Sequence, residues 1–185
     1  MENRKGMEAK DIINFWFIEL KANDWFKKDD QLDFLIKKRF LSFHEKASKG
    51  ELFGWRDSFF GRLAEIIILD QFSRNIFRGK PESFKFDNMA LILAQEAIRS
   101  KVDQELSLEK KGFIYLPFMH SESKIIHEEA VKLFSQKGLE FGLEYELKHK
   151  VMIERFGRYP HRNEILGRKS TPEELEFLKS ADSSF

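Results

Sequence analysis

Apolar residues recur along most of this chain at the three- and four-residue spacing of amphipathic helices. No run alternates apolar and polar side chains between turn signals, so the pattern needs no strand. The sequence therefore predicts an all-α fold of about eight helices, over residues 12–20, 32–49, 61–77, 88–100, 106–118, 124–136, 143–156 and 170–178. Short connections between them favour antiparallel helices stacked in pairs.

Several residues mark the expected helix ends. Gly50 and Gly79 are expected to stop the helices before them, and Pro117 should end or kink the helix in which it falls. Asp87 can cap the helix that follows it. The strongest start signal is the motif TPEE at 171–174, where a threonine cap, a proline and a glutamate three residues after the cap form a capping box.

Length and composition narrow the class of protein. A chain of 185 residues fits a single domain, 1–185, in which we expect residues 1–7 to be flexible. Its 32 basic and 31 acidic residues leave a net charge of +1, which argues against a nucleic-acid or membrane-surface partner. The first apolar cluster, IINFWF, is too short for a signal peptide or a membrane span, so we expect a cytoplasmic protein. The oligomeric state is left open.

Arginine and lysine are segregated along the chain. Residues 51–79 and 151–168 contain eight of the 11 arginines and none of the 21 lysines. The arginine side chain has a planar fork that binds carboxylate or phosphate through two hydrogen bonds and tolerates partial burial. The two segments are therefore expected to use guanidinium geometry, either to bind an anion or to pair with buried carboxylates of the chain itself.

The first segment contains LDQFSRNIFRG, in which Asp70 and Arg74 interrupt an apolar helical stripe one turn apart. Because unpaired buried charge is costly, we expect both to belong to an internal hydrogen-bonded network. Gln71, Asn75 and Arg78 follow on an adjacent face at spacings of four and three. Such a row of amide and guanidinium groups can bind an anion.

Two further stretches carry polar side chains at helix junctions. In LPFMHSES, the residues His120, Ser121 and Glu122 precede a helix whose first N–H groups can attract an anion, although a serine there can simply cap the helix. In RFGRYPHRN, the glycine and proline should break the helix, so that its polar side chains converge from a turn. These side chains are Arg155, Arg158, His161, Arg162 and Asn163.

The chain resembles a mainly bacterial family of unknown function, DUF924, in several segments. The resemblance is carried by LDQFSRNIFRG, YLPFMHSES and RFGRYPHRNEILGRKSTPEE, together with FWF, DWFKKDDQLDFLI and GELFGW. The resemblance covers about residues 12–178. It implies an all-helical fold similar to tetratricopeptide superhelices, and it implies no established activity. The chain departs from the family pattern at Ser73, where the family usually has proline, and at Ser123, where it usually has aspartate. The second departure removes a carboxylate that a metal site could use.

Three functions are compatible with these features. The first is a binding module whose arginine- and histidine-lined pocket takes an anionic small molecule or a peptide carboxylate. The second is a metal-independent hydrolase or lyase with His120 or His161 as acid or base, Glu122 or Asp70 as its partner, and arginines stabilising an anion. The third is an interaction scaffold whose polar network is structural. No familiar zinc-motif spacing occurs, so we expect neither a metal nor a cofactor.

Overall fold

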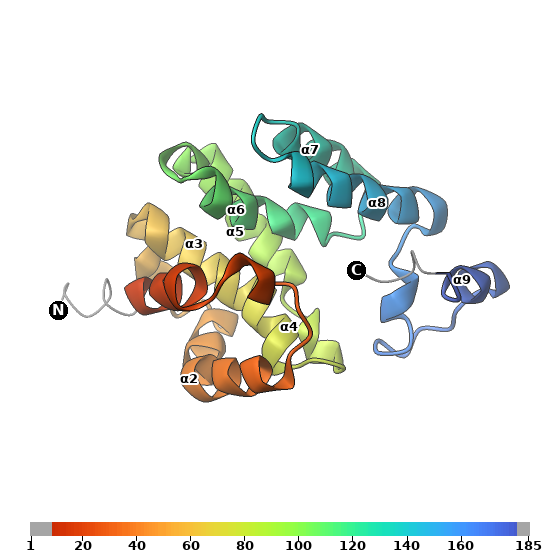
Figure 1. Cartoon of the computed structure of the whole chain (residues 1–185), viewed down its shortest axis with the longest axis horizontal. Coiled ribbons are helices and arrows are strands. Elements are labelled where there is room, and N and C mark those ends of the chain that lie inside the picture. The colour runs from red at the N-terminus through yellow and green to blue at the C-terminus, as the bar shows by residue number, and fades with distance from the viewer. Residues whose placement is uncertain (1–8, 181–185) are drawn as a thin grey trace. The chain divides into compact units, whose positions relative to one another are not determined.

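The structure of the chain, a computed structural model, describes residues 9–180 (Figure 1). This part of the chain is helical and contains no strand, which confirms the predicted all-α class. The α-helices are α2 (Asp30–Ser48), α3 (Phe59–Ile67), α4 (Ser73–Ile76), α5 (Asp87–Arg99), α6 (Leu108–Met119), α7 (Lys124–Phe134), α8 (Glu140–Phe156) and α9 (Pro172–Phe177).

Shorter helical turns connect them. Two are π-helical, η1 (Phe15–Glu19) and η4 (Ile68–Phe72), and η1 continues a helical stretch over residues 9–14. The others are 3₁₀ turns: η2 (Ala22–Asp24), η3 (Phe53–Asp57), η5 (Pro81–Ser83), η6 (Val102–Glu105) and η7 (Pro160–Arg162). The expected flexibility of residues 1–7 concerns a part of the chain outside the described residues.

The chain divides into two compact units. The first comprises the residues up to Arg78 together with Glu82–Pro117, and the second comprises Gly79–Pro81 and the residues from Phe118 onward. Two compact units are compatible with one domain or with two, so the single domain stays a prediction. The tetratricopeptide-like superhelical arrangement stays a prediction as well.

Most of the expected helix ends agree with the structure, and two do not. Gly50 and Gly79 lie in turns with φ of 71° and 76°, as expected of glycines that stop helices. Pro117 was expected to end or kink its helix; it does not end it, because α6 runs on to Met119, and the kink stays a prediction. A proline so close to a helix end removes only one late hydrogen bond. Asp87 does not cap α5, since its carboxylate binds Arg74 and the helix starts at Asp87 without a side-chain cap.

The long helix predicted over residues 61–77 is interrupted by the π-helical turn η4. A π turn contains one residue more than an α turn, so it shifts the faces of the helix on either side. Asp70 and Gln71 belong to this turn, and they are only 1% and 5% exposed. Asp70 and Gln71 are therefore buried at a local irregularity that apolar periodicity did not predict.

Aromatic side chains form the core of the first unit. Trp16 is fully buried, with its ring centroid 5.6 Å from that of Phe72 and 5.8 Å from that of Phe113. Phe15 and Phe40 extend the cluster at 4.8 Å. Rings at these separations and tilts combine large apolar burial with favourable edge-to-face contacts.

The second unit is built on the helical pair α7 and α8, which lie side by side (Figure 1). Met152 and Ile153 of α8 form a small buried core with Tyr159, and Phe177 of α9 packs against it. Tyr159 is fully buried although it follows the end of α8 by three residues. The segment after α8 is therefore anchored in the core of its own unit.

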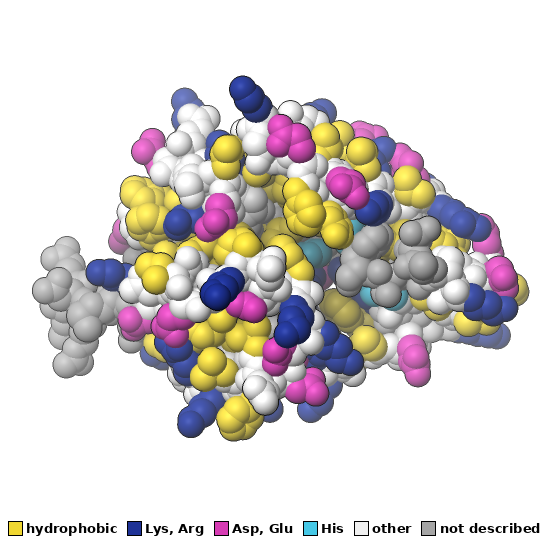
Figure 2. Space-filling view, viewed as in Figure 1, with side chains coloured by type: hydrophobic (Ala, Val, Ile, Leu, Met, Phe, Trp, Pro, Cys, Tyr) yellow, Lys and Arg dark blue, Asp and Glu magenta, His cyan; other side chains and the backbone are white. Residues whose placement is uncertain are grey.

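The surface carries charges of both signs. Figure 2 shows Lys and Arg side chains interspersed with Asp and Glu on the visible face, in keeping with the near-zero net charge. Such interspersed charges create no strong field of one sign over this face. None of the helices within residues 9–180 is long and apolar enough to cross a membrane.

Lys101, just after α5, has a left-handed backbone with φ of 58°, where helices usually place glycine. Replacing it by glycine removes a contact of Cβ with the backbone and should raise the free energy of unfolding by about 1 kcal/mol. Lys49, at the end of α2, has φ of −100° and provides the control, because Lys49→Gly relieves no strain and should destabilise slightly. Equal effects in urea denaturation would contradict the prediction.

Candidate functional site

The arginines of residues 51–79 are bound to carboxylates of the first unit. Arg74 Nη1 lies 3.3 Å from a carboxylate oxygen of Asp70 and donates to its main-chain oxygen at 2.5 Å. The same guanidinium grips Asp87 through two hydrogen bonds of 3.1 Å. This arrangement confirms the predicted internal network of Asp70 and Arg74, with Asp87 as a third member.

Gln71, Asn75 and Arg78 also bind carboxylates of the first unit. The Gln71 amide donates to Asp70 at 2.6 Å, and the Asn75 amide donates to Asp33 at 2.8 Å. Arg78 holds the same carboxylate of Asp33 with Nε and Nη2, at 2.5 and 2.9 Å. An incoming anion would therefore have to compete with carboxylates that already occupy these donors.

His44 and Ser73 form a buried pair that sequence reasoning missed. Nε2 of His44 lies 2.8 Å from Oγ of Ser73, whose hydroxyl donates to the carbonyl of Leu69 at 2.6 Å. Since that hydroxyl hydrogen is used, the imidazole must donate to the serine oxygen. Burial lowers the pKa of His44 to about 4. This pair is a structural contact, because the imidazole offers no lone pair to activate the serine.

In the second unit, the helix break predicted in RFGRYPHRN is confirmed. Gly157 ends α8 in the left-handed conformation, with φ of 70°, and Pro160 begins η7. The turn brings Arg158 and Asn163 to Glu174, the glutamate of the predicted capping box. That capping box is present, with the hydroxyl of Thr171 and the carboxylate of Glu174 each accepting the other residue's N–H.

The Glu174 carboxylate accepts several hydrogen bonds. Arg158 binds it through Nε and Nη2, at 2.7 and 2.9 Å, and the Asn163 amide donates at 3.2 Å. These hydrogen bonds, that of Arg158 above all, lower the pKa of Glu174 to about 2 despite its burial. Arg158 also donates to the main-chain oxygen of Lys169 at 3.0 Å, which fixes the backbone ahead of α9.

Glu122 is held by Arg168, an arginine that the sequence placed in the second segment but not among the ligand-binding residues. The two side chains form a two-pronged pair at 2.7 and 2.9 Å. Arg168 also donates to Oδ1 of Asn163, while the N–H of Tyr159 donates to Glu122. Burial alone would raise the pKa of Glu122, but the hydrogen bonds from Arg168 and Tyr159 hold it below its usual value.

Arg162 and His120 also meet. Nη2 of Arg162 donates to the main-chain oxygen of His120 at 3.1 Å, and the guanidinium lies 4.5 Å from the ring centroid of Tyr159. Arg155 instead binds Glu173 at the surface, at 2.8 Å. We call the pairs Arg158–Glu174 and Arg168–Glu122, together with Asn163, the C-terminal frame.

Histidines surround Tyr159. Its ring centroid lies 6.3 Å from that of His127, 5.6 Å from that of His149 and 5.4 Å from that of His161. Burial, with a smaller effect of the neighbouring histidines, lowers the pKa of His149 to about 3. The Tyr159 hydroxyl donates to the carbonyl of Met119 at 2.5 Å.

His127 and Glu146 form a fully buried pair, with Nδ1 and Oε1 2.7 Å apart. The carbonyl of Ser121, 2.8 Å from Nε2 of His127, can only accept, so Nε2 carries a hydrogen. The hydrogen bond between Nδ1 of His127 and Glu146 then needs one proton, carried either by the imidazole or by the carboxyl group. In both cases the net charge of the pair is zero. Burial raises the pKa of Glu146 against the opposing effect of His127. The Ser121 hydroxyl also accepts the N–H of Ser123 just ahead of α7, which has no side-chain cap.

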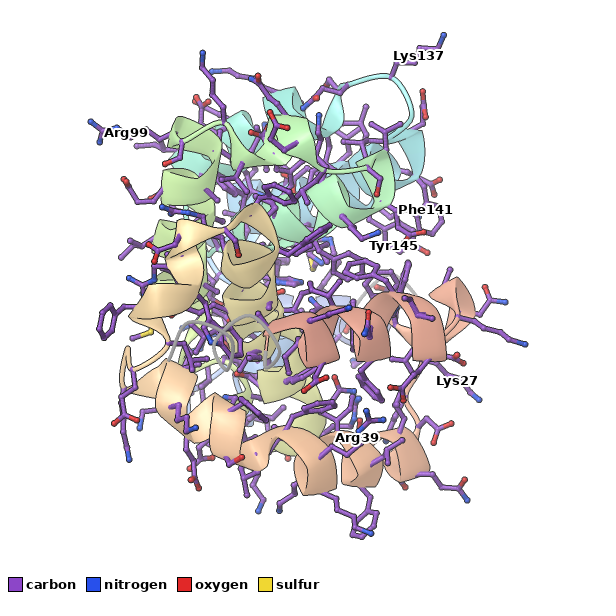
Figure 3. The ribbon with its side chains drawn as sticks, turned by 90° about the vertical axis from the view of Figure 1, so that its left-hand side faces the viewer. Lys27, Arg39, Arg99, Lys137, Phe141 and Tyr145 are labelled. Atoms are coloured by element: carbon purple, nitrogen blue, oxygen red, sulfur yellow. The ribbon has the colours of Figure 1, made fainter. Side chains whose placement is uncertain are left out.

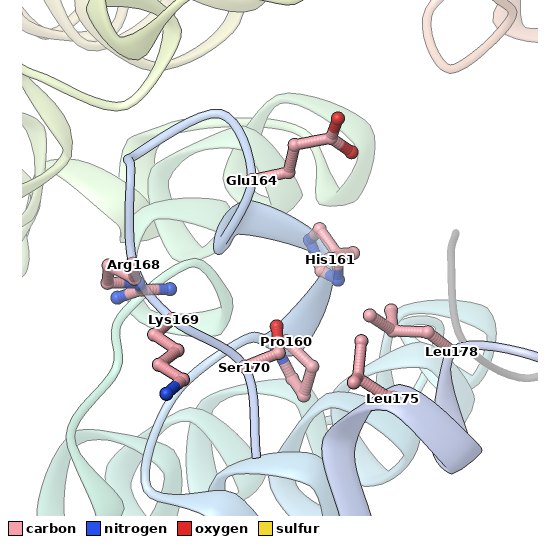
Figure 4. Close-up of a pocket in the computed structure, with 8 residues that line it drawn as sticks. All are labelled: Pro160, His161, Glu164, Arg168, Lys169, Ser170, Leu175 and Leu178. Atoms are coloured by element: carbon pink, nitrogen blue, oxygen red, sulfur yellow. The ribbon is translucent and has the colours of Figure 1, made fainter. Parts of the chain in front are cut away.

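A depression of about 620 Å³ lies on the second unit beside the C-terminal frame (Figure 4). Its apolar lining comes from Pro160, Leu175 and Leu178. Its polar lining comes from His161, Glu164, Arg168, Lys169 and Ser170. Among the residues predicted for a ligand site, only His161 lines this depression. Arg158 and Asn163 do not line it, but they donate hydrogen bonds to two residues that do, Lys169 and Ser170.

The charged side chains that line this depression differ in their hydrogen bonds and ion pairs. The Arg168 side chain donates to Glu122, to Asn163 and to the carbonyl of Tyr159. Lys169 and Glu164 are exposed, and within residues 9–180 neither has an oppositely charged group within 4.0 Å. Sequence reasoning passed over both, because a single exposed lysine or glutamate carries no pattern.

Arg74 and Arg78 belong to the first unit, while Arg155, Arg158 and Arg162 belong to the second. The segregation of arginine from lysine also suggests that these five side chains converge in space, and this stays a prediction. Within the described part of the chain, no three histidine, aspartate or glutamate side chains are placed to hold a metal ion.

Comparisons with known proteins define the class of this all-helical protein. Residues 12–182 match the family described as "Bacterial protein of unknown function (DUF924)", and the chain belongs to that family. It is similar in structure to ATU0120, a protein of unknown function from Agrobacterium tumefaciens. The two share 39% sequence identity with a TM-score of 0.90, over 95% of this chain and 98% of that one. The comparison with curated proteins found no match.

Proposed function

We propose that the chain is a binding module whose second unit takes a small carboxylate-bearing ligand, an anionic small molecule or a peptide carboxylate, in the depression beside the C-terminal frame. The observation that carries the proposal is Lys169, an exposed ammonium group at this depression with no carboxylate partner in the described structure. Two other exposed lysines of the unit, Lys132 and Lys148, are instead paired with glutamates of their own helix.

A second donor stands next to this ammonium. The Asn163 amide donates to Oγ of Ser170 at 3.0 Å, so the serine oxygen is already accepting a hydrogen bond. Its own hydroxyl hydrogen is then available to a ligand on the open side. Because Asn163 is buried and Arg158 holds the carbonyl of Lys169, the backbone of both donors is fixed before a ligand arrives. Such preorganisation reduces the entropy lost on binding.

The arginines have a different task in this proposal. Arg158 and Arg168 neutralise Glu174 and Glu122, and in doing so they connect α9 and the start of α7 to the turn at residues 157–170. A lysine, with a point charge, could not bind a carboxylate through two parallel hydrogen bonds in this way. The arginine-rich segment thus builds the frame, and the lysine just after it meets the ligand.

The pairing of the arginines equally supports the third hypothesis, an interaction scaffold with a purely structural network. The hydrolase or lyase hypothesis has less support, because the carboxylate of Glu122 is bound by Arg168 and by the N–H of Tyr159. A carboxylate held this way with a lowered pKa is a weak general base. A ligand experiment decides between the binding module and the scaffold.

The test measures ligand binding to the full chain by thermal unfolding and by calorimetry. Acetate, butyrate and 4-methylpentanoate should raise the melting temperature with increasing concentration, and chloride at equal ionic strength should not, because a ligand that binds only the folded state stabilises it. Lys169→Gln should weaken binding about tenfold, as expected for the loss of one charged hydrogen bond.

Lys137→Gln is the matched control. Lys137 projects from the loop between α7 and α8 (Figure 3), is exposed, and does not line the depression. This variant should bind carboxylates as the wild type does. If no carboxylate shifts the melting curve, or if both lysine variants lose affinity equally, the binding proposal fails and the scaffold reading is preferred.

A further inference from the structure

The surroundings of the His127 imidazole fix where its hydrogens lie. Nε2 is 2.8 Å from the carbonyl oxygen of Ser121 and 3.1 Å from the hydroxyl oxygen of Tyr159. The Tyr159 hydroxyl gives its own hydrogen to the carbonyl of Met119, so both neighbours of Nε2 act as acceptors. Nε2 therefore carries a hydrogen in the folded unit, and the other ring nitrogen, Nδ1, faces Oε1 of Glu146 at 2.7 Å.

The folded unit can release the proton between His127 and Glu146 only at a large cost in stability. Without it, the lone pair of Nδ1 would face a carboxylate oxygen at hydrogen-bond distance. The carboxylate is fully buried, and its second oxygen, Oε2, has no hydrogen-bond partner within residues 9–180. His127 is also the only group in that part of the chain that forms an ion pair with it. A buried charge without compensation is strongly disfavoured.

The unfolded chain holds this proton much more weakly. Once the two side chains separate, the imidazole and the carboxyl group return to ordinary pKa values of about 6.5 and about 4.3. Above about pH 7.5 the separated groups bind almost no proton, whereas the folded pair binds one. Folding then takes up a proton, and the free energy of unfolding falls as the pH rises.

The pair lies where the segments of the second unit meet. His127 is near the start of α7 and Glu146 is within α8, the two helices that lie side by side in Figure 1. The acceptors of Nε2 come from the segment before α7, which contains Ser121, and from the segment after α8, which contains Tyr159. One buried set of hydrogen bonds therefore joins both helices to both flanking segments.

We propose that the second unit is a pH-sensitive element, which closes with one proton bound between α7 and α8 and opens when that proton is lost in alkaline solution. The inference does not depend on the proposed function. Its effect is opposite in sign to that of an imidazole that is buried without a proton, because such an imidazole destabilises the fold in acid and the pair destabilises it in alkali.

Other titratable side chains lie around the pair. Three are imidazoles, one on α8 and two in the flanking segments: His149, His120 and His161. The charged ones come from α7, from α8 and from the flanking segments: Lys124, Glu128, Lys150, Glu154, Glu122 and Arg162. All of them are present in each protein of the test below, so their own titration cancels in the comparison.

Glu146→Gln tests the proposal, because the glutamine amide can donate to Nδ1 of His127 and does not titrate. Urea denaturation of the full chain, followed by circular dichroism, gives the equilibrium constant for unfolding in water. Between pH 7.5 and pH 9 the wild-type constant should rise about tenfold per pH unit relative to that of Glu146→Gln. Parallel pH curves for these two proteins would refute the proposal.

Glu144→Gln is the matched control. It makes the same chemical change on the same helix, but the Glu144 side chain is 62% exposed and paired with Lys148. This variant should keep the wild-type dependence on pH. If it flattens the curve as Glu146→Gln does, the effect comes from net charge and the proposal is wrong.

A measurement on the wild type alone covers the case in which Glu146→Gln does not fold. Refolding of the full chain in weakly buffered solution at pH 8 should take up about one proton per chain, read from a pH indicator dye. Refolding without proton uptake, or with proton release, would show that the pair is closed without a bound proton and would overturn the inference.

Discussion

Replacing Arg74 by leucine should lower the free energy of unfolding by about 3 to 5 kcal/mol, the cost of breaking a buried ion pair from one side. The guanidinium is bound by two carboxylates, Asp70 and Asp87, which are only 1% and 8% exposed. Without it, both would lose a charged hydrogen-bond partner in the interior of the unit. Urea denaturation of the wild type and the variant at pH 7 measures the loss.

Arg99→Leu is the control for that result. Arg99 is the last residue of α5, its side chain is 82% exposed, and its contact with Glu96 measures 3.8 Å (Figure 3). Exposed pairs contribute little, so this variant should change the free energy of unfolding by less than about 0.5 kcal/mol. A loss in Arg74→Leu no larger than that in Arg99→Leu would show that Asp70 and Asp87 are solvated.

Acid should destabilise the fold through His149. Burial lowers the pKa of this histidine to about 3 in the folded state, against an ordinary value of 6.5. The unfolded chain therefore takes up a proton between these values while the folded chain does not, and stability falls as the pH falls below about 6.5. Between pH 7 and pH 5 the loss from this residue alone is on the order of 2 kcal/mol.

His149→Asn isolates that contribution. The imidazole donates from Nδ1 to the carbonyl of Tyr145 at 2.8 Å, and the amide of asparagine can take over that bond without titrating. Glu146 has the opposite effect on stability, because its raised pKa favours the folded state at lower pH. This residue is present in both proteins, so its contribution cancels in the comparison. The wild type should lose more stability than His149→Asn between pH 7 and pH 5. Parallel pH curves for the two proteins would contradict the prediction.

Local signals in the sequence predicted the helices well. The capping box at Thr171 and Glu174, the glycine stops and the break at Gly157 depend on residues within a few positions of each other, and all are present. The π turn η4 was not predicted, because an extra residue in one turn leaves the apolar spacing almost unchanged. Asp87 was misjudged for a related reason: a cap can be seen locally, whereas the competing partner Arg74 lies 13 positions away.

The candidate site could be predicted only in part. The unusual placement of arginines pointed to RFGRYPHRN as a segment where guanidinium geometry matters, and Arg158 and Arg162 do use it there. It did not point to Lys169 or Glu164, which have no spacing signal of their own. Lys169 enters the proposed site because the neighbouring Arg168 is bound to Glu122, whereas Lys169 has no ion-pair partner within the described residues.

The helical class, most helix ends and the use of arginine in two segments follow from the sequence alone, because each depends on side-chain periodicity, on capping or on composition. The tertiary structure decided which carboxylate each arginine binds. Glu122 and Arg168 are 46 positions apart, and no local rule relates them. Whether a charged side chain holds the fold together or is available to a ligand depends on which opposite charge the folded backbone brings within about 4 Å, and only the folded chain has that geometry.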